Sequence, residues 1–116
     1  MFIKKPIHWV GSSHDDVATL PKAVRRSFGL RLGILQNGAM PLDTKALTQF
    51  GSGVFELRER YEKNAYRLVY VLKLTQAIYV LHVFMKKSKS GIGLPRQEAD
   101  LIVKRLKTAR LLDAQV

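Results

Sequence analysis

Apolar and polar positions alternate with a period of two along three segments in the middle of the chain, residues 54–61, 66–74 and 77–86. This period is typical of β-strands, and the segments are rich in the branched and aromatic residues that strands favour. Only residues 62–65 and 75–76 separate the segments, so we expect an antiparallel meander with short turns. A shorter apolar stretch over residues 7–10 predicts one further strand near the N-terminus.

Helical spacing flanks these strands. Ser12 or Ser13 can cap a short helix, and Pro21 is expected to end it and to open a second helix that stops at Asn37-Gly38. The apolar stripe of the second helix is Val24, Phe28, Leu32 and Leu35. Pro95 opens a last helix, whose predicted apolar face is Ala99, Ile102, Val103, Leu106 and Ala109. Residues 39–53 have mixed polarity and are predicted to be a loop.

These elements predict a single α+β domain over residues 1–116: an antiparallel sheet in the order β-α-α-β-β-β, an N-terminal helical hairpin on one face and a C-terminal helix. Strand parity assigns an apolar face that should pack on the hairpin, formed by Phe55, Leu57, Leu68, Tyr70, Leu72, Tyr79, Leu81 and Val83. The other face is mixed, with Glu56, Arg58, Arg60, Arg67, Val69, Val71, Ile78, Val80, His82, Phe84 and Lys86. We expect the last helix to cover its apolar end and to leave its cationic end open.

The charge balance indicates a polyanionic partner. Lys and Arg number 20 against 9 Asp and Glu, a net charge of +11, which suits a nucleic acid, an acidic protein or an anionic membrane. No uninterrupted apolar run reaches the roughly 18 residues of a membrane span. The chain has no cysteine, which excludes disulfides, thiolate zinc sites and cysteine nucleophiles. It also lacks a glycine-rich phosphate loop and metal-binding histidine spacing, so we expect no metal and no small-molecule cofactor.

The cationic end of the second face is the candidate site, and each of its residues has two readings. Like charges on neighbouring strands repel, so the clustered cations suggest an absent anion such as a phosphodiester; they could equally form a solvated face paired with Glu56 and Glu59. His82 is either a hydrogen-bonded sheet residue or a group for proton transfer. Phe84 is either a core residue or a platform for a base, and the lysines of residues 86–89 form either a linker or a grip on a phosphate backbone.

The order of these elements resembles the RelE/ParE superfamily of type II toxin–antitoxin toxins. Residues 54–60, Val-Phe-Glu-Leu-Arg-Glu-Arg, are similar to a strand of that superfamily in which a Glu-Leu-Arg triplet recurs, and residues 66–70, Tyr-Arg-Leu-Val-Tyr, are similar to its next strand. Three further segments resemble the HigB-type branch of the superfamily, which is found in phages and bacterial chromosomes. They are Leu-Gln-Asn-Gly at residues 35–38, Leu-His-Val-Phe-Met-Lys-Lys-Ser at residues 81–88 and Lys-Arg-Leu after Pro95.

The resemblance implies a metal-independent endoribonuclease, an mRNA interferase that often acts on the ribosome and inhibits translation in the cytoplasm. It implies cleavage by 2′-hydroxyl transesterification, with Arg58 and Arg67 stabilising the phosphoryl transition state. Lys86 and Lys87 would bind the RNA backbone or lower the pKa of the 2′-hydroxyl, and His82 would transfer a proton. Further RNA contacts would come from Arg60, Phe84 and Lys89. Several members place a tyrosine or histidine near the C-terminus, which residues 111–116 lack, so His82 and Lys86 both remain candidates for proton transfer.

The resemblance also implies a cognate antitoxin, often a helix-turn-helix protein, whose acidic surface would offset part of the positive charge. Two other functions fit the same basic face. One is a ParE-like toxin that acts on DNA gyrase without nuclease activity, and the other is a non-catalytic nucleic-acid-binding module. Cleaved mRNA ends would distinguish the first reading from both alternatives.

Overall fold

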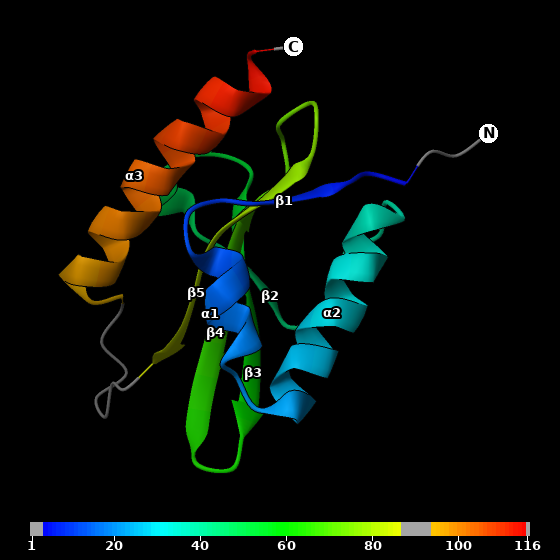
Figure 1. Ribbon diagram of the computed structural model, residues 1–116, viewed down its shortest axis with the longest axis vertical. Helices are drawn as coiled ribbons and strands as arrows, with labels where there is room; N and C mark the ends of the chain where they lie inside the picture. The colour runs from blue at the N-terminus through cyan, green and yellow to red at the C-terminus, as the bar shows by residue number, and fades with distance from the viewer. Residues whose placement is uncertain (1–3, 87–93, 116) are drawn as a thin grey trace.

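The computed structural model describes residues 4–86 and 94–115, which form a five-stranded sheet between helices (Figure 1). The N-terminal part contains β1 (Ile7–Trp9), α1 (Ser13–Ala18) and α2 (Lys22–Gln36). The strands that follow are β2 (Thr44–Ala46), β3 (Val54–Tyr61), β4 (Asn64–Val71) and β5 (Ile78–Lys86), with a 3-10 turn at Thr48–Phe50 before β3. The last element is α3 (Arg96–Asp113). The predicted α+β class is therefore confirmed.

The sheet has the strand order β1-β5-β4-β3-β2. The central meander of β3, β4 and β5 is antiparallel, as expected, but β1 pairs with β5 in parallel, so the sheet is mixed. A hairpin turn forces its two strands to be antiparallel, whereas the long crossover after β1 imposes no such direction. The predicted loop was also partly wrong, since β2 lies within it and pairs with β3. Three residues are too few for a period to be visible in the sequence.

Helices pack on both faces of the sheet, and Figure 1 shows α2 and α3 on opposite sides of it. All four residues predicted for the apolar stripe of α2 are buried, in a core with Leu57, Leu68, Tyr70, Ile78, Val80 and Val83. A second core lies beneath α3, where Ile102, Leu106 and Ala109 meet Val54, Val69, Val71, Tyr79, Leu81 and Phe84. Val103, predicted to belong to that apolar face, is instead exposed. No helix in the described ranges is long and apolar enough to cross a membrane.

A β-bulge in β5 overturns part of the predicted face assignment. Tyr70 pairs with Val80, but the preceding residue, Val69, pairs with His82, so Leu81 is an extra residue in β5. The bulge reverses the parity of the strand. Before it, the even-numbered residues Ile78 and Val80 face α2 and the odd-numbered Tyr79 and Leu81 face α3, the opposite of the prediction. After it, the predicted assignment of Val83 and Phe84 holds.

Hydrogen bonds connect α3 to the β4–β5 connection, to β5 and to Ser12. Near its C-terminal end, the Asp113 carboxylate accepts hydrogen bonds from the backbone N–H groups of Thr75 (2.8 Å) and Gln76 (2.6 Å) in the β4–β5 connection. In its middle, the Arg105 guanidinium donates to the carbonyl oxygen of Leu81 (3.0 Å) and to the hydroxyl oxygen of Ser12 (2.9 Å). These contacts set α3 over the end of the sheet that contains the β4–β5 connection.

Candidate functional site

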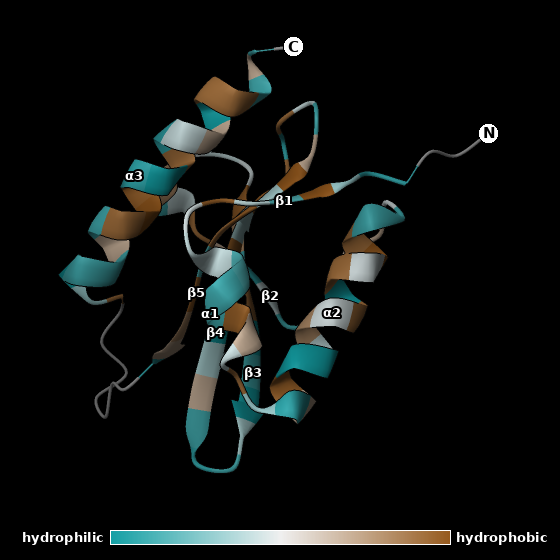
Figure 2. Ribbon diagram, in the orientation of Figure 1, coloured by the Kyte–Doolittle hydropathy of each residue, from teal (hydrophilic) through white to brown (hydrophobic). Residues whose placement is uncertain are grey.

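Cationic side chains from four strands meet on the α3 side of the sheet, towards the turn of the β3–β4 hairpin. Arg58 lies directly opposite Arg67, which lies opposite Phe84 of the α3-side core. Arg60 lies opposite Ala65, which lies opposite Lys86. Directly paired residues share a face. Figure 2 shows the hairpin becoming hydrophilic towards its turn.

The edge strand β2 brings one more cation to this face. Lys45 lies opposite Glu56, which lies opposite Val69 of the α3-side core. Together these residues form a group that we call the cationic patch: Lys45, Arg58, Arg60, Arg67 and Lys86. Lys45 was missed by the sequence reasoning, because its segment was interpreted as a loop.

The members of the patch differ in exposure. Lys45, Arg58 and Arg60 are exposed, Lys86 is half-buried and Arg67 is only 9% exposed. The pKa of Lys86 is lowered, first by partial burial and then by the nearby charge of Arg67. The carboxylate of Glu56 opposes this by raising the pKa, and Lys45 and Arg58 add smaller lowering contributions. Removing an ammonium group from water and placing it beside other cations both disfavour its charged form. The patch therefore gives Lys86 a larger neutral fraction than a solvated lysine has.

A buried carboxylate, that of Glu56, lies on the same face of β3 as the patch. Glu56 is completely buried, and its Oε2 accepts a hydrogen bond from Nη1 of Arg67 at 3.3 Å. Its Oε1 and the Nε of Arg67 are also buried, and neither has a hydrogen-bond partner among the described residues. Of the two carboxylates that could neutralise the patch, Glu56 pairs with one of its members, Arg67, whereas Glu59 does not. Glu59 lies on the opposite face of β3, where its carboxylate pairs with Arg31 at 2.8 Å.

His82 lies next to the patch but under the first turn of α3. It is 6% exposed, and its Nε2 is 3.2 Å from Oε2 of Glu98. The pKa of His82 is lowered, mainly by burial. The carboxylate of Glu98 raises this pKa in part, and the nearby charge of Arg105 lowers it further. The other ring nitrogen, Nδ1, is buried without a partner in the described part of the chain. The hydrogen-bonded sheet residue is thus the reading of His82 that the geometry favours.

Phe84 separates His82 from Lys86 along β5. Its ring stacks on the imidazole of His82, with centroids 4.7 Å apart and planes inclined by 19°. Since Phe84 is 9% exposed and belongs to the core beneath α3, most of its ring already packs on protein.

The structure thus brings together four of the predicted site residues, Arg58, Arg60, Arg67 and Lys86. The side chains of Phe84 and His82 are buried next to them. Lys87 and Lys89 lie outside the described residues.

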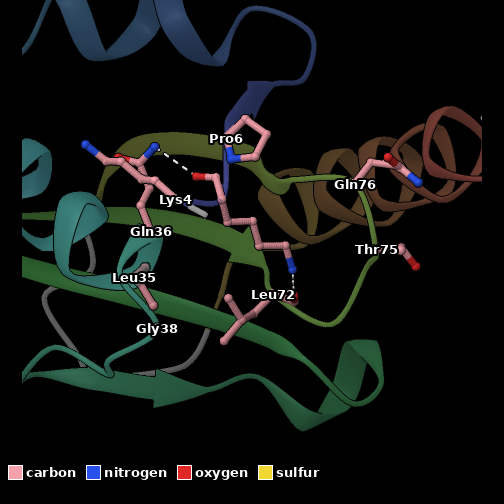
Figure 3. Close-up of a pocket in the computed structure, with 9 residues that line it drawn as sticks. Lys4, Pro6, Leu35, Gln36, Gly38, Leu72, Thr75 and Gln76 are labelled. Atoms are coloured by element: carbon pink, nitrogen blue, oxygen red, sulfur yellow. Dashed lines mark hydrogen bonds between the residues drawn. The ribbon is translucent and has the colours of Figure 1, made fainter. Parts of the chain in front are cut away.

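A pocket lies away from this patch, beside the C-terminal end of α2 (Figure 3). It has a volume of about 550 Å³ and is lined by Lys4, Lys5, Pro6, Leu35, Gln36, Gly38, Leu72, Thr75 and Gln76, none of which belongs to the cationic patch. The ammonium group of Lys5 donates to the carbonyl oxygens of Leu72 (3.0 Å) and Leu74 (2.7 Å). The ammonium group of Lys5 therefore links the segment before β1 to the segment after β4. Among the described residues, no group of three acidic or histidine side chains could hold a metal ion.

A comparison with protein families finds a match over most of the chain. The family model described as "Phage derived protein Gp49-like (DUF891)" matches residues 15–107, which run from α1 through most of α3. The match therefore includes every residue of the cationic patch, together with Glu56, His82 and Phe84. No curated protein and no solved structure matches the chain significantly.

Proposed function

The chain belongs to the Gp49-like family of phage-derived proteins, and from this premise we propose that it is the toxin of a type II toxin–antitoxin system that cleaves mRNA. The family is associated with toxins of the RelE/HigB type. One observation carries the proposal further. Four cations from β3, β4 and β5 share the α3 side of the sheet, one of them pairs with the buried carboxylate of Glu56, and the other three remain accessible to an incoming phosphodiester.

The arrangement of the patch suits the charge that develops during RNA cleavage. In a transesterification, the 2′-oxygen attacks the adjacent phosphorus, negative charge builds on the non-bridging oxygens and the bond to the 5′-oxygen breaks. A base accepts the proton of the 2′-hydroxyl and the departing 5′-oxygen takes up a proton from solvent, so the products are a 2′,3′-cyclic phosphate and a 5′-hydroxyl end. A guanidinium group can hold two phosphoryl oxygens at once. We assign this role to Arg58 and Arg67, which occupy directly paired positions on the same face of β3 and β4.

Lys86 is our candidate for the proton transfer at the 2′-hydroxyl. Its pKa is lowered, which increases the fraction of neutral amine that could accept this proton and is the direction of shift that suits a catalytic base. The burial of His82 and its contact with Glu98 favour a supporting role, in which the ring holds Phe84 and the strand end that bears Lys86. Arg60, Phe84, Lys87 and Lys89 would complete the contacts with RNA.

The proposed partners are mRNA, on the ribosome, and a cognate helix-turn-helix antitoxin. A net charge of +11 in 116 residues favours an acidic protein surface as well as RNA. Because phosphate contacts release counterions, RNA affinity should fall as salt rises, with a slope of about −0.7 per phosphate contacted.

The test of this function is inducible expression followed by primer extension on a reporter transcript. Expression of the wild-type chain should arrest growth and produce new 5′ ends in the transcript, whereas a variant that lacks both Arg58 and Lys86 should produce neither. The gyrase reading predicts growth arrest with stalled gyrase–DNA complexes and intact transcripts, and the binding-module reading predicts RNA binding without scission. Either pattern in the wild type would contradict the nuclease.

A further inference from the structure

Glu56 is an unusual residue for a surface that should attract a polyanion. Its side chain is completely buried, although it lies on the same face of β3 as Arg58 and Arg60. Burying a carboxylate is costly unless it is paired and hydrogen-bonded. The hydrogen bond from Arg67 is its single one within the described part of the chain, so the two side chains depend on each other.

The contact between Glu56 and Arg67 leaves most of the guanidinium unused. Arg has five N–H donors, and here one bond of 3.3 Å joins Nη1 to the carboxylate while Nε is buried without a partner. Charge-assisted hydrogen bonds are usually shorter, about 2.7–2.9 Å. The carboxylate therefore binds the guanidinium through Nη1, Nε is enclosed by protein, and Nη2 is the nitrogen whose donors are left for another anion.

We propose that Glu56 is a positioning residue of the RNA-cleaving site, a buried carboxylate that orients the guanidinium of Arg67 towards the scissile phosphate. This inference rests on the proposed function and extends it. Glu56 acts through Arg67 and does not touch RNA, because none of its surface is exposed. It also offsets the repulsion between Arg67 and the opposed Arg58, so the two cations stay adjacent before RNA arrives.

A positioning role for an anion predicts opposite effects on binding and on turnover. Removing the charge of Glu56 makes the patch more positive, which favours binding of any polyanion. The same change frees the guanidinium of Arg67 to rotate away from its productive orientation, and a misplacement of about 1 Å can lower a rate by about 10²-fold. A merely structural role would instead weaken binding and turnover together.

The chain offers a matched control. Glu56→Gln and Glu59→Gln remove the same charge from the same strand, β3, but Glu59 faces α2 and pairs with Arg31. Binding is measured with a 2′-O-methyl RNA oligonucleotide of mixed sequence, which lacks the attacking hydroxyl. Cleavage is measured on a translated reporter transcript with ribosomes, and the Nε–H resonance of Arg67 is followed by NMR.

For Glu56→Gln we expect the affinity for the oligonucleotide to rise about two- to fivefold, saturated cleavage to fall about 10²-fold, and the Nε–H resonance of Arg67 to shift or broaden. Glu59→Gln should change the cleavage rate and the resonance little. Wild-type cleavage by a folded Glu56→Gln, or an unchanged resonance, would overturn the inference. If the wild type itself cleaves no RNA, the proposed nuclease fails, and the affinity and the resonance still decide whether Glu56 positions Arg67.

A second variant covers the case in which Glu56→Gln does not fold. Glu56→Asp keeps the negative charge but withdraws the carboxylate by one methylene, so the charge of the patch is unchanged while the contact with Arg67 is lost. We expect wild-type affinity with reduced cleavage. An Asp variant that cleaves at the wild-type rate would contradict the positioning role.

Discussion

Arg58 and Arg67 lie directly opposite each other on adjacent strands, and Arg67 pairs with the buried carboxylate of Glu56. Opposed like charges destabilise a pair of strands. Arg58 is exposed and forms no ion pair within the described ranges. The sheet thus contains an unfavourable like-charge pair, Arg58 and Arg67, at the centre of the patch.

Replacing Arg58 by alanine should reduce function without reducing stability. Arg58→Ala removes a like-charge contact, so we expect the free energy of unfolding to stay within about 0.5 kcal/mol of wild type. Loss of a positioned electrostatic donor should lower the cleavage rate about 10²–10³-fold. Primer extension and urea denaturation measure the two effects. Arg25→Ala, which removes the same charge from the exposed side of α2, is the control and should leave cleavage unchanged; equal activity of the two variants would exclude Arg58 from the site.

Replacing Arg67 by alanine should damage the fold as well as the site. Arg67→Ala leaves Glu56 buried without a counter-charge, and breaking a buried ion pair in this way costs about 3–5 kcal/mol. Urea denaturation should show that loss. The double variant Glu56→Gln/Arg67→Gln removes both charges and should recover most of the stability while remaining inactive. A loss below about 1 kcal/mol in Arg67→Ala would mean that Glu56 and Arg67 are not the buried ion pair described above.

Stability should decline in mild acid because of His82. Its pKa in the folded chain is lowered, mainly by burial, so the unfolded chain takes up a proton first as the pH falls below about 6.5. The folded state is therefore favoured above that pH and loses this advantage as the pH falls towards the lowered pKa. The groups that face His82, Glu98, Arg105 and Asp16, are unchanged in His82→Gln. Thermal unfolding between about pH 7 and pH 5 should thus show a shallower decline in the variant, and parallel curves would contradict the assignment.

Two glycine substitutions should have opposite effects on stability. Gly11 has a φ of +59°, and a Cβ atom there would lie 2.6 Å from Nε of Arg105, so Gly11→Ala should cost about 1–2 kcal/mol by straining the backbone and displacing an anchor of α3. Gly29 lies within α2 with open space around the Cβ position. Gly29→Ala should stabilise the protein by about 0.5–1 kcal/mol. Chemical denaturation compares the two, and stabilisation by Gly11→Ala would show that Arg105 does not lie against Gly11.

Much of the candidate site could be predicted from strand parity. Arg58, Arg60 and Arg67 share a face because β3 and β4 are regular and joined by a two-residue turn, which sets their register. Lys86 and Phe84 also fall on that face, since they follow the bulge in β5. The prediction for Ile78 to Leu81 was wrong because a bulge has no clear signature in a single sequence, and one extra residue reverses every side chain on one side of it.

Glu56 illustrates a different limit. The sequence placed it on the cationic face, and its charge suggested a partner for one of the cations. Whether it would be solvated or enclosed depends on what covers β3, and β2 was not visible among residues 39–53. The pairing of Lys45 with Glu56 likewise required the fold.

By itself, the sequence determined the α+β class, the buried stripe of α2, the central meander and the basic character of one sheet face. These features arise from local periods and from charges that any regular strand or helix would present in the same way. Only the tertiary structure decided the parallel pairing of β1, the parity reversal in β5, and the burial of Glu56, Arg67 and His82. These depend on contacts between residues far apart in the chain, whose relative positions no local pattern encodes.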